Sequence, residues 1–276
     1  MRNLKGKTAI IPGAARPIGR AIAEKLAKKG ANLVLPYFDW PESNQEMKEA
    51  FDRKKFPYLA CHVDLRKKGQ VKKMVNKITA KFGALHILIN NIERGGMPVL
   101  HGSYEHELNN KQWQLELSTC LHAKWLLFHY CLPLMRKSGS GTVINISSIA
   151  ALVGRSGPAA PFFSDGYSAA NQAISSLTRT WAKEAAPNIR VNELMLGLIN
   201  SRHGKNTRGW SLLKDDDKRR LAKQILLERI GSPEDVAEMI LFMVSKAGYM
   251  TGATIRLDGG FTLGSDPVPP IPETAL

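Results

Sequence analysis

The chain has little cysteine, few aromatic residues and no long apolar run. Its three cysteines, Cys61, Cys120 and Cys131, have the spacing of neither a metal site nor a set of disulfides. We therefore expect reduced thiols in a cytoplasmic protein and no metal. No stretch approaches the ~18 consecutive apolar residues that a membrane helix needs, so we expect no membrane partner. The N-terminus lacks the apolar segment and cleavage site of a signal peptide.

Acidic residues are also scarce relative to basic ones, 24 against 39, which gives a net charge of +15. The excess lies in short dispersed runs such as Lys73, Lys77 and Lys81, a pattern typical of solvated helix faces. The functional alternative is an anionic partner: a phosphorylated cofactor, an acyl carrier or a nucleic acid. Because no aromatic residues interleave with the basic runs, as base stacking requires, nucleic acid is the least favoured of the three.

What the chain does contain is an alternation of strand and helix patterns, which predicts βαβ units and a parallel sheet. Short apolar runs predict strands at 8–11, 32–35, 58–63, 86–92, 142–146, 189–196 and 253–257. We expect Pro36 to end the second strand. Amphipathic spacing predicts helices over 18–29, 43–54, 70–82, 111–136 (kinked or broken near Pro133), 167–185 and 233–246.

The chain shows no internal repeat and no sign of a second domain. We expect one domain over residues 1–262, in which the polar, basic segment 198–231 forms a lid. Residues 263–276 are rich in proline, which predicts an extended or disordered tail. The stretch from Thr8 to Gly30 predicts a buried strand, a turn with glycine and a helix. Such a turn binds phosphate, because the free amides and the dipole of the helix both point at it.

Seven segments in order resemble the short-chain dehydrogenase/reductase family, in particular its 3-oxoacyl-ACP-reductase-like classical members. They are the turn with Gly13 and Gly19, ILINN at 87–91, INISS at 144–148, the helix opened by Tyr167, IRVN at 189–192 with Gly197, GSPEDV at 231–236, and TG…DGG at 251–260. The resemblance implies a doubly wound Rossmann fold: a seven-stranded parallel sheet of order 3-2-1-4-5-6-7 with helices on both faces. It also implies a dinucleotide at the carboxyl ends of the strands and a homodimer or homotetramer.

In this family a tyrosine moves a proton to or from the substrate oxygen while a nicotinamide moves hydride. A lysine four residues later stabilises tyrosinate by its charge. A serine binds the carbonyl, and an asparagine on the long helix holds a relay water. The resemblance places Tyr167 and Ser148 in the first and third roles, with Asn171 at the lysine position and Cys120 at the asparagine position. The next basic residue on the Tyr167 helix, Arg179, is about 18 Å further along.

The interval between the serine and the tyrosine is longer than the family usually has, so Ser156 and Ser164 are alternatives to Ser148. Two other departures leave cofactor binding open. Pro17 occupies a glycine position and has no N–H, and Glu93 occupies another. Arg16 matches members that prefer NADP(H) to NAD(H). The cofactor contacts that the resemblance implies are Gly13, Ala15, Arg16, Ile18, Gly19, Tyr37, Asp64, Leu65, Asn91, Tyr167, Asn171 and Ile199.

Two functions follow as alternatives. The first is an NAD(P)(H)-dependent oxidoreductase that acts on the carbonyl or hydroxyl of a 3-oxoacyl-like small molecule. Its rate would be low or its pH optimum elevated, because Tyr167 lacks its activating cation. The second is a catalytically silent binding or scaffold protein that keeps the fold.

Overall fold

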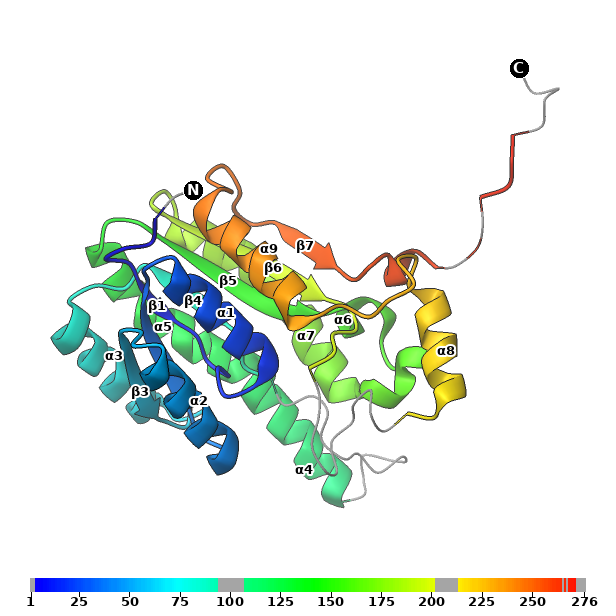
Figure 1. Cartoon of the computed structure of the whole chain (residues 1–276), viewed down its shortest axis with the longest axis horizontal. Helices are drawn as coiled ribbons and strands as arrows, with labels where there is room; N and C mark the ends of the chain where they lie inside the picture. Colours follow the sequence, from blue (N-terminus) through cyan, green and yellow to red (C-terminus); the bar gives the residue numbers. More distant parts are fainter. Residues whose placement is uncertain (1–2, 94–106, 202–212, 265, 267, 272–276) are drawn as a thin grey trace.

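The computed structural model describes residues 3–93, 107–201, 213–264, 266 and 268–271 (Figure 1). At its centre is a seven-stranded sheet in the order β3-β2-β1-β4-β5-β6-β7, with every pair parallel, which confirms the predicted topology. The strands are β1 (Thr8–Ile10), β2 (Asn32–Tyr37), β3 (Tyr58–His62), β4 (Ile87–Asn90), β5 (Gly141–Ser148), β6 (Ile189–Leu196) and β7 (Thr254–Leu257).

Helices cover both faces of this sheet (Figure 1). One face packs against α1 (Pro17–Lys28), α2 (Pro41–Arg53) and α9 (Pro233–Ser245). The other packs against α3 (Lys68–Phe82), α5 (Ala123–Lys137) and α7 (Asp165–Ala185). Successive strand residues therefore enter different cores, which is why the strands read as continuous apolar runs rather than alternating ones. Smaller elements are α4 (Glu107–Glu116), a π-helix (Leu117–His122), α6 (Ala150–Val153), α8 (Asp215–Gln224) and the 3₁₀ segments Gly157–Phe162 and Phe261–Leu263.

The expectation that Pro36 ends the second strand is wrong, because β2 continues through it to Tyr37. Pro36 lies opposite Cys61 in β3. Amides in a parallel strand alternate between the two neighbours, and the amide of Leu33 points to the β3 side. The ring nitrogen of Pro36 therefore faces β1, whose pairing with β2 has already ended at Val34. The proline removes no ladder hydrogen bond at this position.

The long helix predicted over 111–136 begins earlier and is interrupted elsewhere. It begins at Glu107, and α5 runs through Pro133 to Lys137. The interruption is the π-helical segment Leu117–His122, which joins α4 to α5. Such wider turns are frequent at functional sites, and this one contains Cys120.

The structure describes only part of the segment predicted as a lid. Within it, α8 is helical and Ile199 forms an isolated bridge with Gly231, whereas residues 202–212 lie outside the described part of the chain. From Gly264 onward the described residues of the proline-rich tail carry no secondary structure and extend away from the sheet (Figure 1). Among the described helices, none has both the length and the apolar character that crossing a membrane would demand.

Candidate functional site

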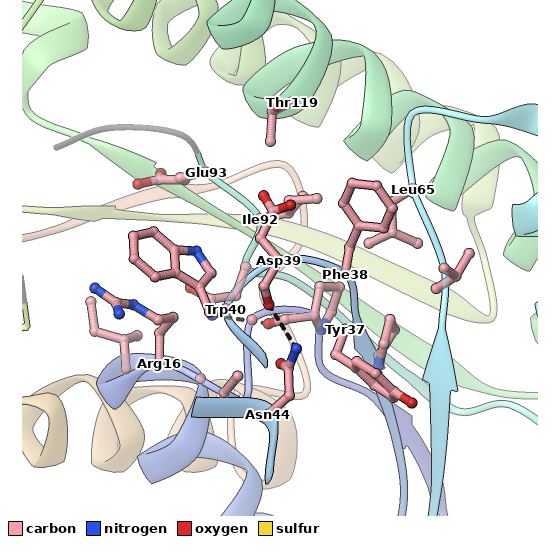
Figure 2. A pocket seen from close by; sticks show the side chains of 18 of the residues that line it. Arg16, Tyr37, Phe38, Asp39, Trp40, Asn44, Leu65, Ile92, Glu93 and Thr119 are labelled. Carbon is pink, nitrogen blue, oxygen red and sulfur yellow. Dashed lines mark hydrogen bonds between the residues drawn. The ribbon is translucent and has the colours of Figure 1, made fainter. Parts of the chain in front are cut away.

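A cleft runs along the carboxyl ends of β1, β2, β3 and β4 (Figure 2). It is a cavity of about 230 Å³. In a doubly wound sheet this is where the strand order reverses and where ligands bind. The cleft is lined by nine of the predicted cofactor contacts, namely Gly13, Ala15, Arg16, Ile18, Gly19, Tyr37, Asp64, Leu65 and Asn91.

The turn between β1 and α1 leaves no room for side chains at its two glycines. Gly13 has a φ of +71°, and a Cβ there would lie 2.7 Å from the carbonyl oxygen of Asn91. A Cβ on Gly19 would lie closer than 3.0 Å to three backbone atoms of Gly13 and Ala14. The turn is tied down by Arg20, whose guanidinium donates to the carbonyl oxygen of Ala14 at 3.0 Å. This tight cradle at a helix N-terminus fits a phosphate group.

Pro17 is accommodated in this cradle. It is the first residue of α1, a position whose N–H makes no bond within the helix in any case. The proline therefore removes one amide from the anion site, and those of Ile18 and Gly19 still belong to the first turn. The residues present fit a pyrophosphate with one donor fewer than the family's glycine provides.

The β2 side of the cleft carries an arginine stacked on an indole. The guanidinium of Arg16 lies 4.5 Å from the centre of the Trp40 ring (Figure 2). The loop that holds Trp40 is fixed by Asn44, whose side-chain amide donates to the carbonyl oxygen of Asp39 at 2.7 Å. Partial burial lowers the pKa of Arg16 from its ordinary value, although a guanidinium stays protonated at neutral pH. The cleft thus has a positioned positive charge beside its β2 end.

The β3 end of the cleft is built from stacked rings and one ion pair. Phe38 and His62 stack with their centroids 5.7 Å apart, and Arg66 lies over the Phe38 ring at 5.6 Å. Arg66 also binds both carboxylate oxygens of Asp64, at 2.8 and 2.9 Å. Burial would raise the pKa of Asp64, but the hydrogen bonds from Arg66 outweigh it and lower that pKa. Sequence reasoning proposed Asp64 and missed Phe38 and Arg66.

A second cavity, of about 80 Å³, continues from the cleft and shares Ile18, Glu93 and Ser201 with it. It contains Ser148 and Tyr167 together. The Ser148 hydroxyl oxygen accepts a hydrogen bond from the amide of Ala150 at 3.2 Å. Ile199, another predicted contact, lines the same cavity. A serine and a tyrosine at the end of a nucleotide-type cleft can bind and protonate one oxygen atom of a ligand.

Ser156 and Ser164, the alternatives to Ser148, make other contacts. Ser156 is exposed and donates to the carbonyl oxygen of Val153 at 2.5 Å. Ser164 caps the N-terminus of α7 by accepting from the amide of Tyr167, and its hydroxyl donates to the carboxylate of Glu116 at 2.7 Å. These contacts make Ser164 a positioning residue for α7.

The residues at the lysine and asparagine positions are buried beside the cavity. The Asn171 amide donates to the carbonyl oxygen of Tyr167 at 2.9 Å. Its Oδ1 is buried and has no hydrogen-bond partner in the described part of the chain. Cys120 is fully buried in the cluster that includes Tyr167. Neither residue lines the cleft or the second cavity.

A cation that sequence reasoning did not find lies on the other side of Tyr167. The Tyr167 hydroxyl donates to Oε2 of Glu93 at 2.8 Å. The other oxygen of that carboxylate lies 3.8 Å from the ammonium of Lys124 in α5, a side chain with no exposed surface. The sequence held one signal: Lys124 falls on the helix face of the buried residues Cys120 and Leu127. A lysine on such a face needs a partner. No group of metal-binding side chains occurs among the residues that the structure describes.

The chain is similar to known proteins over most of its length. The sequence model of a family described as enoyl-(acyl carrier protein) reductase matches residues 13–262. The 3-oxoacyl-[acyl-carrier-protein] reductase FabG of Thermotoga maritima is 30% identical over 266 residues, covering 94% of this chain and 99% of its own. Glucose 1-dehydrogenase 2 of Bacillus subtilis is 30% identical over 269 residues, covering 95% and 97%.

Solved structures share the fold. A structure titled as a putative short-chain alcohol dehydrogenase from Sinorhizobium meliloti has a TM-score of 0.81 at 25% identity, covering 95% of this chain and 98% of that one. The NADPH-dependent 3-quinuclidinone reductase of Rhodotorula rubra has a TM-score of 0.80 at 24% identity, covering 95% and 93%. At that identity the likeness concerns the fold alone.

Proposed function

The chain belongs to the short-chain dehydrogenase/reductase family, and on that premise we propose that it is an NAD(P)(H)-dependent oxidoreductase acting on a 3-oxoacyl-like carbonyl or the matching hydroxyl. One observation carries the proposal: Ser148 and Tyr167 line one cavity, and that cavity shares three lining residues with the nucleotide-type cleft. The 3-oxoacyl class is supported by relatives named as 3-oxoacyl-[acyl-carrier-protein] reductases.

In this proposal the two hydroxyl groups share one substrate oxygen. Ser148 accepts from the amide of Ala150, which leaves its own hydrogen for a bond to that oxygen. Tyr167 gives a proton to the oxygen in reduction and takes one from it in oxidation. Phe163, which stacks on Tyr167 with centroids 6.2 Å apart, limits the access of water. The nicotinamide supplies or receives the hydride when it is bound.

Different residues of the cleft would hold different parts of the dinucleotide. The turn from Gly13 to Gly19 would hold the pyrophosphate, and the stacked end at Phe38 and Asp64 would hold the adenine. Arg16 lines the cleft and stacks on Trp40 in the loop after β2, on the side where the 2′-phosphate distinguishes NADP(H) from NAD(H). This arrangement supports a preference for NADP(H).

Calorimetric titration with NADPH and then NADH tests the proposal. We expect NADPH to bind in the micromolar range and NADH more weakly. Arg16→Ala should lower the affinity for NADPH by about tenfold, which corresponds to the loss of one charge-assisted hydrogen bond. It should leave the affinity for NADH almost unchanged. Arg53→Ala, at the exposed end of α2, is the matched control. Failure of both nucleotides to bind would refute the proposed function.

The silent alternative has one observation in its favour. The carboxylate of Glu93 already accepts the Tyr167 hydroxyl at 2.8 Å, in the position where the family has glycine. A protein that binds NADPH but turns over no 3-oxoacyl thioester or matching alcohol, in either direction, would be a binding protein of this kind.

Self-association is part of the proposal. Trp125 is 42% exposed on α5 and stacks between His122 and His129, at 6.0 and 5.2 Å. An exposed aromatic stack of this kind is typical of a contact surface. We expect a homodimer or homotetramer in sedimentation experiments, and Trp125→Glu should shift the protein towards the smaller species.

A further inference from the structure

Lys124 is a buried charge that the proposed function leaves without a task. Its ammonium donates a hydrogen bond to the carbonyl oxygen of Ile146 in β5 and lies 3.8 Å from Oε1 of Glu93. An unpaired ammonium inside a protein is strongly unfavourable. The partners Ile146 and Glu93 therefore explain how Lys124 is held without exposed surface at this depth.

Glu93 joins this cation to the tyrosine. Its Oε2 accepts from the Tyr167 hydroxyl at 2.8 Å. Its Oε1 is buried and has no hydrogen-bond partner in the described part of the chain, so the ammonium of Lys124 is the charge that it faces. The Glu93 side chain as a whole is 24% exposed and lines both the cleft and the second cavity.

Resting on the function proposed above, we propose that Tyr167, Glu93 and Lys124 form a proton-relay triad in place of the tyrosine–lysine pair. Asn171 stands where the family has the lysine and brings no charge. The positive charge comes instead from α5, and the carboxylate of Glu93 connects it to Tyr167. Glu93 and Lys124 are positioning residues, because they act on the substrate through Tyr167.

In alcohol oxidation, each proton and the hydride have a donor and an acceptor. The substrate O–H bond breaks and its proton passes to the Tyr167 oxygen, while the proton of Tyr167 passes to the Glu93 carboxylate. A nicotinamide held in the cleft would accept hydride from the carbon that bears this oxygen, which would leave a carbonyl. Glu93 then releases the proton to solvent. Reduction reverses every step, and the arrangement in the structure, with a protonated tyrosine and a carboxylate acceptor, is the starting point for oxidation.

The charges around Tyr167 determine the direction in which each substitution should shift its pKa. The described titratable or charged groups packed around it are Glu93 and Lys124, Cys120 on the π-helix, and Glu116 at the end of α4, which binds Ser164 at the N-cap of α7. The contacts through Glu93 keep the ammonium within about 9 Å of the tyrosine oxygen. Loss of the ammonium should raise the pKa of Tyr167, and loss of the carboxylate charge should lower it.

The first test needs neither cofactor nor substrate. Ultraviolet titration of tyrosinate in the wild type, minus the same titration of Tyr167→Phe, gives the pKa of Tyr167. Lys124→Met should raise this pKa by about one unit and Glu93→Gln should lower it by a similar amount. Lys137→Met, an exposed lysine of the same helix, is the matched control and should change nothing. Shifts of the same sign, or shifts no larger than in the control, would overturn the triad.

The second test follows turnover of acetoacetyl-CoA with NADPH, and of 3-hydroxybutyryl-CoA with NADP⁺, against pH. The wild type should work near neutral pH. Lys124→Met should lower kcat there by at least tenfold, change KM little and move the optimum to alkaline pH. Asn171→Lys in the Lys124→Met background should restore most of the loss, since it places a positive charge on α7, four residues after Tyr167. A Lys124→Met protein with the wild-type pH profile would overturn the triad.

These tests distinguish a failure of the proposed function from a failure of the triad. A wild type that binds no NADPH refutes the function and leaves the tyrosine titration as the measure of the triad. A wild type that turns over, with pH profiles unchanged in both variants, refutes the triad and leaves the function intact. Thermal melting identifies a Lys124→Met protein that does not fold. Glu93→Gln, which replaces a partly exposed side chain, then carries both tests.

Discussion

Replacing Gly19 by alanine tests whether the turn between β1 and α1 is as tight as the structure shows. The added Cβ would lie 2.5 Å from the carbonyl carbon of Gly13 and 2.8 Å from the amide nitrogen of Ala14. Both neighbours are backbone atoms, which cannot rotate away as the end of a side chain can. The helix must therefore move away from the turn that we assign to the pyrophosphate.

The size of the effect follows from two opposing contributions. Overpacking of this kind costs about 3 kcal/mol at the upper end of the usual range. Alanine in place of glycine inside a helix stabilises by up to about 1 kcal/mol. We expect a net loss of about 2 kcal/mol in the free energy of unfolding, or about 5 °C in melting temperature for a chain of this size. NADPH should also bind at least about tenfold more weakly, because close packing of the helix on the turn positions the pyrophosphate.

Gly69→Ala provides the matched control. Gly69 lies in the first turn of α3, as Gly19 does in α1, but a Cβ there would meet nothing within 4 Å. This variant should melt at or slightly above the wild-type temperature and bind NADPH normally. Urea unfolding, thermal melting and calorimetry on the two variants decide the matter. A Gly19→Ala protein as stable as Gly69→Ala, with unchanged NADPH affinity, would refute the argument.

Two further predictions concern stability. The side chain of Asp235 completes the capping box of α9. Hydrogen bonds, above all from Arg229, lower the pKa of Asp235. Its contribution to the free energy of unfolding is therefore fully present above the unfolded pKa of about 4, and is lost as the pH falls towards the folded pKa. Asp235→Asn should lose about 1 kcal/mol at neutral pH and less in acid, as urea unfolding would show; a difference independent of pH would contradict this. Glu193 is fully buried and accepts hydroxyl hydrogen bonds, including one from Thr254 at 2.7 Å. Glu193→Ala should destabilise by about 3 kcal/mol and Glu193→Gln by much less, and equal losses in urea would contradict the pairing.

The fold could be predicted because its signals are local. Each strand is a short apolar run, and each major helix has one apolar face, so the alternation alone indicates a doubly wound sheet. The error at Pro36 arose because the effect of a proline depends on which neighbour its nitrogen faces, and that neighbour comes from elsewhere in the chain. The break within the long helix was placed at Pro133, the residue with an obvious local mechanism, whereas the structure has it at the π-helix.

The candidate site likewise contains residues that local spacing predicts and residues that only the packed fold brings together. Residues in the turn from Gly13 to Gly19 could be named because their spacing is set within one βα unit. The role of Lys124 could not be predicted, because its partner Glu93 follows a different strand and Tyr167 lies on a third element. Spacing along α7 led only to Asn171. The pairing exists only once β4, α5 and α7 are packed together.

The pairing of Glu93 with Lys124 also weighs against the silent alternative. Taken alone, Glu93 puts a carboxylate beside the tyrosine, and Lys124 puts an ammonium into the core; together each compensates the other. A scaffold gains nothing from this arrangement, since apolar residues in place of a buried ion pair are often as stable or more stable. The Glu93 carboxylate of this pair accepts the Tyr167 hydroxyl directly. A charge pair placed at the Tyr167 hydroxyl therefore supports the proposed active site over the silent alternative.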